Sequence, residues 1–181
     1  MISSFKQYLV EEERHAYFTL GRMNPPTIGH GKLIDKLSSK AGRNPYKIFL
    51  TQTQDSKKNP LSYPQKVKFA RKMFRKHARN IVLNKKIKTV MNAAVDLYDS
   101  GFRSVTMVVG DDRVREFNAL LNNYNGKRSS HGLYNFKEIN VVSAGERDPD
   151  SESASGASAT KQREAASDND FTKFSQGLPK D

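Results

Sequence analysis

The sequence of 181 residues contains no cysteine and no tryptophan. Without cysteine the chain forms no disulfide bond and performs no thiolate chemistry, and a reducing compartment suits it. No apolar run approaches the length that spans a bilayer, and the first residues lack the charged start and apolar centre of a signal peptide. The lack of tryptophan leaves any base stacking to tyrosine and phenylalanine. These absences predict a cytoplasmic protein without a membrane partner.

Acidic residues are also scarce, and they are missing entirely from one long stretch. The chain has 31 lysines and arginines against 19 aspartates and glutamates, a formal net charge of +12. Between Ser56 and Val95 there is no acidic residue, although twelve lysines and arginines fall there. A solvated surface usually mixes both signs. The stretch therefore predicts a polyanionic partner, which is a nucleotide, a nucleic acid or a phosphate-rich surface.

Strand-like and helix-like segments alternate along the chain. Strands are expected at residues 16–20, 46–51, 81–83, 104–109 and 136–142. Helical periodicity covers residues 28–40, 62–77, 89–100 and 114–124. The apolar side of the 62–77 helix is expected to hold Val67, Phe69, Ala70, Met73, Phe74 and His77. The alternation predicts an α/β fold, a single Rossmann-like doubly wound domain of about five parallel strands flanked by helices, with its topological switch point at the first strand.

The segment from Gly21 to His30 joins the first expected strand to the first expected helix. An α/β protein places anion sites at such junctions, because the N–H groups at a helix start point toward the ligand. Gly21 lets the backbone pass close to a phosphate, and Arg22 carries a permanent positive charge. Thr27 and His30 share one face of the helix start. The segment therefore predicts a phosphate site.

This segment, Gly21-Arg-Met-Asn-Pro-Pro-Thr-Ile-Gly-His30, resembles the first motif of the nucleotidyltransferase superfamily of adenylyl- and cytidylyltransferases, G-x-F-x-P-x-[HT]-x-G-H. Met23 stands where the motif has an aromatic residue, and Thr27 fills the position that is His or Thr. The opening Gly-Arg is most similar to the archaeal-type nicotinamide-mononucleotide adenylyltransferases. The resemblance implies that His30 and Thr27 are catalytic and bind the phosphates. It also implies nucleotide contacts by Gly21, Arg22, Met23 and Gly29.

A second phosphate site is expected near the C-terminus, in Ser158-Ala-Thr-Lys-Gln-Arg163. Two hydroxyls, the N–H groups of a helix start and an arginine one turn later form a cup for phosphate. The segment resembles the superfamily's second motif, [ST]-[STGA]-T-x-[IVM]-R, with Gln162 at the usually apolar position, and it is most similar to phage-encoded members. The resemblance implies that Ser158 and Thr160 bind the nucleotide and that Arg163 is catalytic. Residues 143–157 are expected to form a mobile loop.

Gly110-Asp111-Asp112 ends the apolar 104–109 run and begins the next helix, so it is expected at the same sheet edge as Gly21. Either aspartate is able to cap the helix, and either is able to bind ribose hydroxyls or a metal ion. The segment resembles the G-x-D motif that contacts the adenylate in the superfamily. The resemblance places Gly110 and Asp112 at the nucleotide.

The segment Asn59-Pro-Leu-Ser-Tyr-Pro-Gln-Lys66 resembles the substrate loop of the archaeal-type enzymes, N-P-F-[ST]-x-x-E-R, with Gln65-Lys66 in place of Glu-Arg. The resemblance implies that Asn59 and Lys66 bind the acceptor, and Arg71 in the same basic stretch is assigned the same role. The partners are then ATP and a phosphorylated small-molecule acceptor. Nicotinamide mononucleotide is the acceptor that matches best.

The implied reaction transfers AMP from ATP to the acceptor phosphate, which releases pyrophosphate and forms NAD. Mg²⁺ is the implied cofactor. It bridges phosphate oxygens and needs few protein ligands, so no metal-binding side chains are assigned. A CTP-dependent cytidylyltransferase shares these motifs, and the basic stretch also suits a nucleic-acid-binding protein with the same fold. These alternatives stay open, as does the oligomeric state.

Residues 1–14 are expected to be separate from the domain, which then spans residues 15–179. Apolar residues at helical spacing suggest an amphipathic helix docked on the domain. The segment also resembles the short N-terminal leader of prohead proteins of large tailed phages. The prohead protease cuts at a Leu-x-Glu pattern, here Leu9-Val10-Glu11. That resemblance implies a protein packaged inside a phage capsid and cleaved after Glu11.

Overall fold

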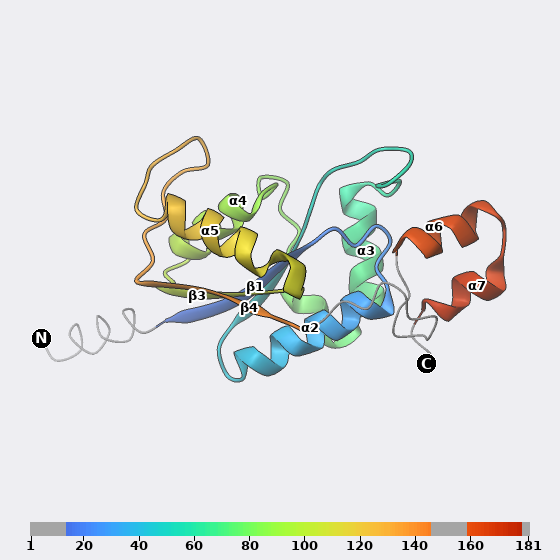
Figure 1. Cartoon of the computed structure of the whole chain (residues 1–181), viewed down its shortest axis with the longest axis horizontal. Coiled ribbons are helices and arrows are strands. Elements are labelled where there is room, and N and C mark those ends of the chain that lie inside the picture. Colours follow the sequence, from blue (N-terminus) through green and yellow to red (C-terminus); the bar gives the residue numbers. More distant parts are fainter. Residues whose placement is uncertain (1–13, 146–158, 179–181) are drawn as a thin grey trace, which may run out of the picture.

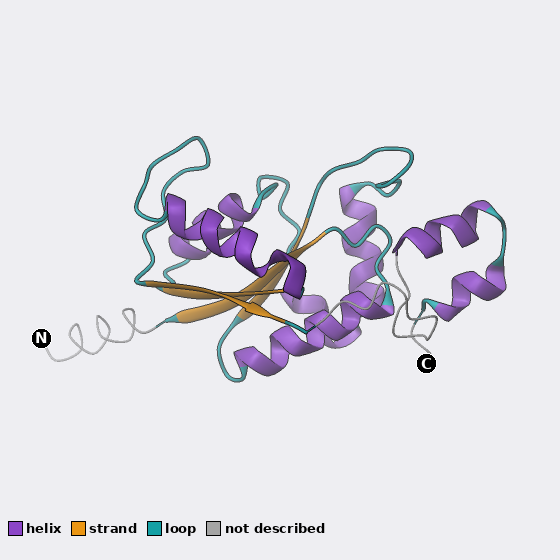
Figure 2. Ribbon diagram, viewed as in Figure 1, coloured by secondary structure: helices purple, strands orange, loops and turns teal. Residues whose placement is uncertain are grey.

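The computed structural model describes residues 14–145 and 159–178. Four strands form one parallel sheet in the order β2-β1-β3-β4, and helices cover both of its faces (Figure 1 and Figure 2). The strands are β1 (His15–Gly21), β2 (Tyr46–Leu50), β3 (Ser104–Val109) and β4 (Glu138–Ser143). Since β1 pairs with β2 on one side and with β3 on the other, the predicted doubly wound fold and its switch point at the first strand are confirmed.

The sheet has four strands rather than the expected five, because residues 81–83 do not form a strand. Ile81 makes a single parallel bridge with Ile48 of β2. The hydroxyl of Tyr63 pairs with the backbone groups through which a ladder with β2 would continue. It donates to the carbonyl oxygen of Val82 at 3.2 Å and accepts from the backbone N–H of Asn84 at 2.9 Å. The pairing at this edge of the sheet therefore stops after one bridge.

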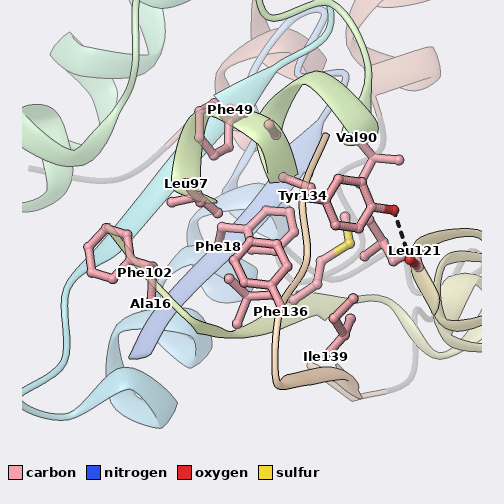
Figure 3. Close-up of a cluster of buried hydrophobic side chains, with 14 of the residues drawn as sticks. Ala16, Phe18, Phe49, Val90, Leu97, Phe102, Leu121, Tyr134, Phe136 and Ile139 are labelled. Carbon is pink, nitrogen blue, oxygen red and sulfur yellow. Dashed lines mark hydrogen bonds between the residues drawn. The ribbon is translucent and has the colours of Figure 1, made fainter. Parts of the chain in front are cut away.

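One face of the sheet is covered by α4 (Val90–Asp99) and α5 (Val114–Tyr124). Alternate residues of β1 and β3, Phe18 among them, point toward this face, as the two-residue period of a strand requires. Figure 3 shows the resulting cluster, in which the hydroxyl of Tyr134 donates to the carbonyl oxygen of Leu121 at 2.7 Å. The segment between α5 and β4 thus completes this half of the core.

The other face is covered by α2 (Ile28–Ala41) and α3 (Tyr63–Met73). The helix α3 begins at the expected N-cap, Ser62. The backbone N–H and the hydroxyl of Ser62 both donate to Gln65 Oε1, at 3.0 and 2.9 Å. This capping box gives Gln65 a structural role. The helix ends before the expected residue 77 and is followed by a 3₁₀ helix, η1 (Arg75–Asn80).

The last two helices, α6 (Ala159–Ser167) and α7 (Phe171–Gln176), form a hairpin beside the start of α2 (Figure 1). The backbone N–H of Ile28 donates to the carbonyl oxygen of Gly177 at 3.3 Å. Gln162 is buried, and a Cβ atom at Gly177 would collide with its side-chain amide. The unusual glutamine of the second motif therefore packs inside this hairpin.

Some expectations fall outside the described residues. They concern residues 1–13 of the expected leader, residues 146–157 of the expected loop, and Ser158. Of the helices that the structure describes, none combines the length and the apolar character that crossing a membrane requires.

Candidate active site

The candidate site lies at the carboxyl ends of the strands. Arg22 follows β1 directly, residues 51–62 follow β2, and Gly110 follows β3 and leads into a 3₁₀ helix, η2 (Asp111–Arg113). Because all four strands are parallel, these segments meet at one edge of the sheet. The Arg22 segment is central, since β1 lies between β2 and β3.

Buried residues hold the loop between β1 and α2 in place. Met23 is buried with a φ of 42°, a left-handed conformation that persists in a non-glycine residue only where the surroundings enforce it. The buried side chain of Asn24 accepts from the backbone N–H of Leu61 at 3.1 Å and donates to the carbonyl oxygen of Leu61 at 3.3 Å. These two hydrogen bonds fix the first motif to the segment that precedes α3.

Thr27 and His30 contact each other at the start of α2, as their spacing predicted. The backbone N–H of Thr27 donates to His30 Nδ1 at 3.0 Å, and Thr27 Oγ1 lies 2.9 Å from the same nitrogen. Because Nδ1 accepts a hydrogen bond, the proton of the neutral ring is on Nε2, which makes Nε2 a donor. Thr27 is buried. Its hydroxyl therefore orients the histidine.

An open cleft with a volume of about 630 Å³ brings the two motifs together. Such a volume suits a small organic ligand. The cleft is lined by Arg22, Ser56, Lys57, Lys58, Thr160, Arg163, Glu164, Ser167 and Asp168. Four of these residues are cationic and two are anionic, so the cleft favours an anionic ligand. Thr27 and His30 do not line it and lie further along the first motif.

Arg163 connects the two motifs. Its Nη1 donates to the carbonyl oxygen of Asn24 at 2.6 Å, and its Nη2 donates to Thr160 Oγ1 at 3.2 Å. Burial lowers the pKa of Arg163, and the neighbouring charge of Arg22 lowers it further. Two cations that disfavour each other in this way favour an anion between them, because an anion removes their repulsion.

A comparison with known families agrees with this arrangement. The family described as cytidylyltransferase-like matches residues 18–165, a span that runs from β1 into α6 and contains both motifs. The chain belongs to the cytidylyltransferase-like family. It is therefore a nucleotidyltransferase, and a nucleotide is among its substrates. No curated protein matches the chain.

In this cytidylyltransferase-like chain, a tight turn after β2 carries two of the cations that line the cleft. Asp55 Oδ1 accepts from the backbone N–H groups of Lys57 and Lys58 at 2.9 and 2.6 Å. Asn59 Nδ2 donates to Asp55 Oδ2 at 2.6 Å. The hydrogen bond from Asn59 is the largest of the causes that lower the pKa of Asp55 to about 2.

Sequence reasoning missed the role of this aspartate. The available signal was the run Asp55-Ser-Lys-Lys-Asn59, because aspartate commonly accepts from the backbone N–H groups two and three residues later in a turn. Sequence reasoning also missed Glu164, Ser167 and Asp168, which line the cleft. Glu164 directly follows Arg163 of the second motif, Ser167 lies one turn later at the end of α6, and Asp168 is the next residue.

The three residues assigned to the acceptor have different surroundings. The ammonium of Lys66 is fully buried and donates to the carbonyl oxygen of Arg22 at 2.8 Å and to Thr51 Oγ1 at 3.3 Å. Arg71 Nη2 donates to the carbonyl oxygen of Ile81 at 2.7 Å, and Arg71 does not line the cleft. Asn59 is buried in the turn after β2, and its Oδ1 has no hydrogen-bond partner among the described residues. None of the three lines the cleft, but Asn59 follows Lys58 directly and Lys66 donates to Arg22, and both Lys58 and Arg22 line it.

Lys66 fastens the end of β1 to the end of β2, and its burial has a measurable consequence. Burial first, and the charge of Arg22 second, lower the pKa of Lys66 from 10.5 to about 8. Between these two values the unfolded chain binds more protons at this group than the folded protein does. The contribution of Lys66 to the free energy of unfolding therefore rises with pH through this window.

We expect Lys66→Met to remove this pH dependence. Relative to the variant, the wild-type free energy of unfolding should rise by about 3 kcal/mol between pH 7 and pH 10.5, since each pH unit in the window is worth about 1.4 kcal/mol. Urea unfolding at a series of pH values measures it. Lys68→Met, on the exposed side of the same helix, is the matched control and should follow the wild type. A constant gap between wild type and Lys66→Met would contradict the burial of a protonated ammonium.

The predicted adenylate residues lie at the end of β3. Asp112 is exposed, and a Cβ atom at Gly110 would come within 2.9 Å of its Oδ1. The hydroxyl of Ser143, at the end of β4, donates to Asp111. The N-cap of α5 is Arg113. Neither aspartate therefore caps that helix, and the carboxylate of Asp112 stays at the sheet edge.

A metal ion in this site would depend on the nucleotide. Among the residues that the structure describes, no three His, Asp or Glu side chains come together as metal ligands. Nucleotidyltransferases typically use a divalent metal ion, and Mg²⁺ binds mainly to substrate phosphates and water with one or two carboxylates. Glu164 and Asp168 are the carboxylates that line the cleft. These residues fit a metal ion that enters with its triphosphate.

Proposed function

We propose that the chain is an adenylyltransferase that joins ATP to nicotinamide mononucleotide and produces NAD and pyrophosphate. The observation that carries the proposal is the single cleft lined by Arg22 of the first motif and by Thr160 and Arg163 of the second. Membership of the cytidylyltransferase-like family supports nucleotidyl transfer in general. The resemblance of the opening Gly21-Arg22 to archaeal-type enzymes supports ATP and nicotinamide mononucleotide in particular.

The reaction is an in-line displacement. An oxygen of the acceptor phosphate attacks the α-phosphorus of ATP and forms a new P–O bond. The bond from the α-phosphorus to the oxygen that bridges it to the β-phosphorus breaks, and pyrophosphate leaves with the electron pair. The attacking phosphate is already an anion, so no general base is required. Catalysis then consists of positioning and of stabilising the charge that develops on the phosphate oxygens.

Each part of the site has a role in this proposal. His30 donates from Nε2 to an α-phosphate oxygen, and Thr27 keeps the ring in that orientation. The guanidinium groups of Arg22 and Arg163, with the hydroxyl of Thr160, bind the β- and γ-phosphates. Residues at the sheet edge bind adenosine, namely Gly21, Met23, Gly29, Gly110 and Asp112. Residues of the turn after β2 bind the acceptor, namely Lys57, Lys58 and Asn59.

Glu164 and Asp168, the carboxylates that line the cleft, would hold an Mg²⁺ ion that enters with the triphosphate. When bound, the ion would neutralise part of the charge on the departing pyrophosphate. Ser158, which lies outside the described residues, is proposed to add a hydroxyl to the triphosphate contacts.

Pyrophosphate release from the purified full chain tests the proposal. Each of ATP, CTP, GTP and UTP is paired with nicotinamide mononucleotide or with an alcohol phosphate, with Mg²⁺ present. We expect turnover with ATP and nicotinamide mononucleotide, and NAD as the product by mass spectrometry. Turnover with CTP and an alcohol phosphate would replace the proposal with a cytidylyltransferase. No turnover with any pair would contradict the assignment of nicotinamide mononucleotide as acceptor.

A further inference from the structure

We propose that α3 and the start of η1 carry a docking surface for single-stranded nucleic acid. The surface, the basic face, consists of Lys68, Phe69, Lys72, Arg75 and Lys76, all of which are exposed. None of these residues lines the nucleotide cleft. The inference is independent of the proposed reaction, because it concerns residues outside the cleft.

Among the described residues, no side chain of opposite sign pairs with the cations of the basic face. Each ion pair of the described residues lies elsewhere, and no cation of the basic face takes part in one. Lys68 and Lys72 are four residues apart on α3, a spacing at which like charges repel on a helix, and Arg75 and Lys76 follow at the start of η1. A polyanion removes this repulsion when its phosphates bind between the cations.

The arrangement of the cations favours a chain of phosphates over a single phosphate group. Lys68 and Lys72 lie about 6 Å apart along the axis of α3 at 1.5 Å per residue, and Arg75 and Lys76 continue the basic face onto η1. The helix presents its cations outward, whereas a site for one phosphate brings its donors together around a point. A row of outward cations matches the backbone of a polynucleotide.

Phe69 indicates that the strand is single. Helical periodicity predicted a buried Phe69, yet its side chain is 44% exposed, because Val67 and Ala70 make the contact with the sheet. The ring lies on the same side of the helix as Lys72, three residues further along. Bases of a single strand stack on exposed aromatic rings between cations, while a duplex keeps its bases stacked inside. The combination of one aromatic ring and four cations therefore fits a single strand.

Fluorescence anisotropy with the full chain tests the surface. The probes are a labelled 20-nucleotide oligo(dT), an oligo(U) of the same length and a 20-base-pair duplex, each at 50 and 200 mM salt. We expect both single strands to bind more tightly than the duplex, and the preferred sugar identifies the natural ligand as DNA or RNA. Saturating ATP should not displace either strand, because the cleft is separate.

Three variants locate the binding. Reversal of all four cations to glutamate should weaken single-strand binding tenfold or more. It should also reduce the slope of log K against log salt by about 3, since each phosphate contact contributes about 0.7. Phe69→Ala should weaken it about tenfold. Lys127→Glu/Arg128→Glu, in an exposed loop between α5 and β4, is the matched control and should bind like the wild type.

Thermal melting and replacement of the four cations by glutamine accompany these measurements. The glutamine variant removes charge without adding repulsion, and it should show the same loss. The proposal is overturned if the wild type binds no polynucleotide, if it prefers the duplex, if ATP displaces the strand, or if the basic-face variants bind as tightly as the wild type.

Discussion

Replacement of His30 by alanine is expected to lower turnover at saturating ATP by about a hundredfold or more. In the proposed reaction the Nε2 donor acts on charge that develops in the transition state, and loss of one such donor typically costs two to three orders of magnitude. The contact between Thr27 and His30 Nδ1 leaves Nε2 as the protonated nitrogen. Pyrophosphate release under saturating substrates measures the effect directly.

The control separates a lost donor from a damaged helix. Alanine at position 30 also removes an acceptor for the backbone N–H of Thr27, which costs the start of α2 about 1 kcal/mol. Thermal melting shows whether the fold survives, and ATP binding should change much less than turnover. Lys32→Ala, on the exposed side of the same helix, should keep full turnover. Turnover of His30→Ala within threefold of the wild type would contradict the role given to this histidine.

Replacement of Arg163 by alanine is expected to lower kcat/KM for ATP by roughly tenfold to a hundredfold. A hydrogen bond to a charged group contributes about 1.5–3 kcal/mol. Arg163 donates to the Asn24 carbonyl of the first motif, and we propose that it also binds the triphosphate. Much of the loss should appear in the KM for ATP, because in the proposed reaction the arginine contacts the triphosphate before as well as during transfer. Initial rates over a range of ATP concentrations separate the two parameters.

Two further variants make the result specific to the guanidinium. Arg163→Lys keeps a charge but not the two parallel donors, so it should recover only part of the loss. Lys173→Ala removes an exposed cation from α7 of the same hairpin and should leave kcat/KM unchanged. Equal activity of Arg163→Ala and Lys173→Ala would show that the second motif does not bind the triphosphate.

Several features of the site were predictable from local sequence. The spacing of Thr27 and His30 predicted their contact, and Ser62 predicted the start of α3, because capping and helical periodicity depend on residues close in the chain. Parallel strands predicted a shared edge for Gly21 and Gly110. The convergence of Arg22 and Arg163 was implied by the family resemblance, and no local pattern in the sequence encodes it.

Other features depend on partners distant in sequence. Lys66 is buried because two oxygens at the ends of β1 and β2 accept from its ammonium. Both oxygens lie outside α3, so the sequence of that helix does not predict the contact. Residues 81–83 have strand-forming side chains, yet the hydroxyl of Tyr63 pairs with the backbone of Val82 and Asn84, where a ladder with β2 would continue. In both cases a side chain forms hydrogen bonds with polar groups that are distant in the sequence, so a local pattern does not predict the contact.

The most direct test of the central claim is a crystal structure of the full chain with Mg²⁺ and a non-hydrolysable ATP analogue. We expect a triphosphate in the cleft between Arg22 and Arg163, with His30 Nε2 within hydrogen-bond distance of an α-phosphate oxygen. A triphosphate bound away from either arginine, or bound there with His30 turned from the α-phosphate, would contradict it.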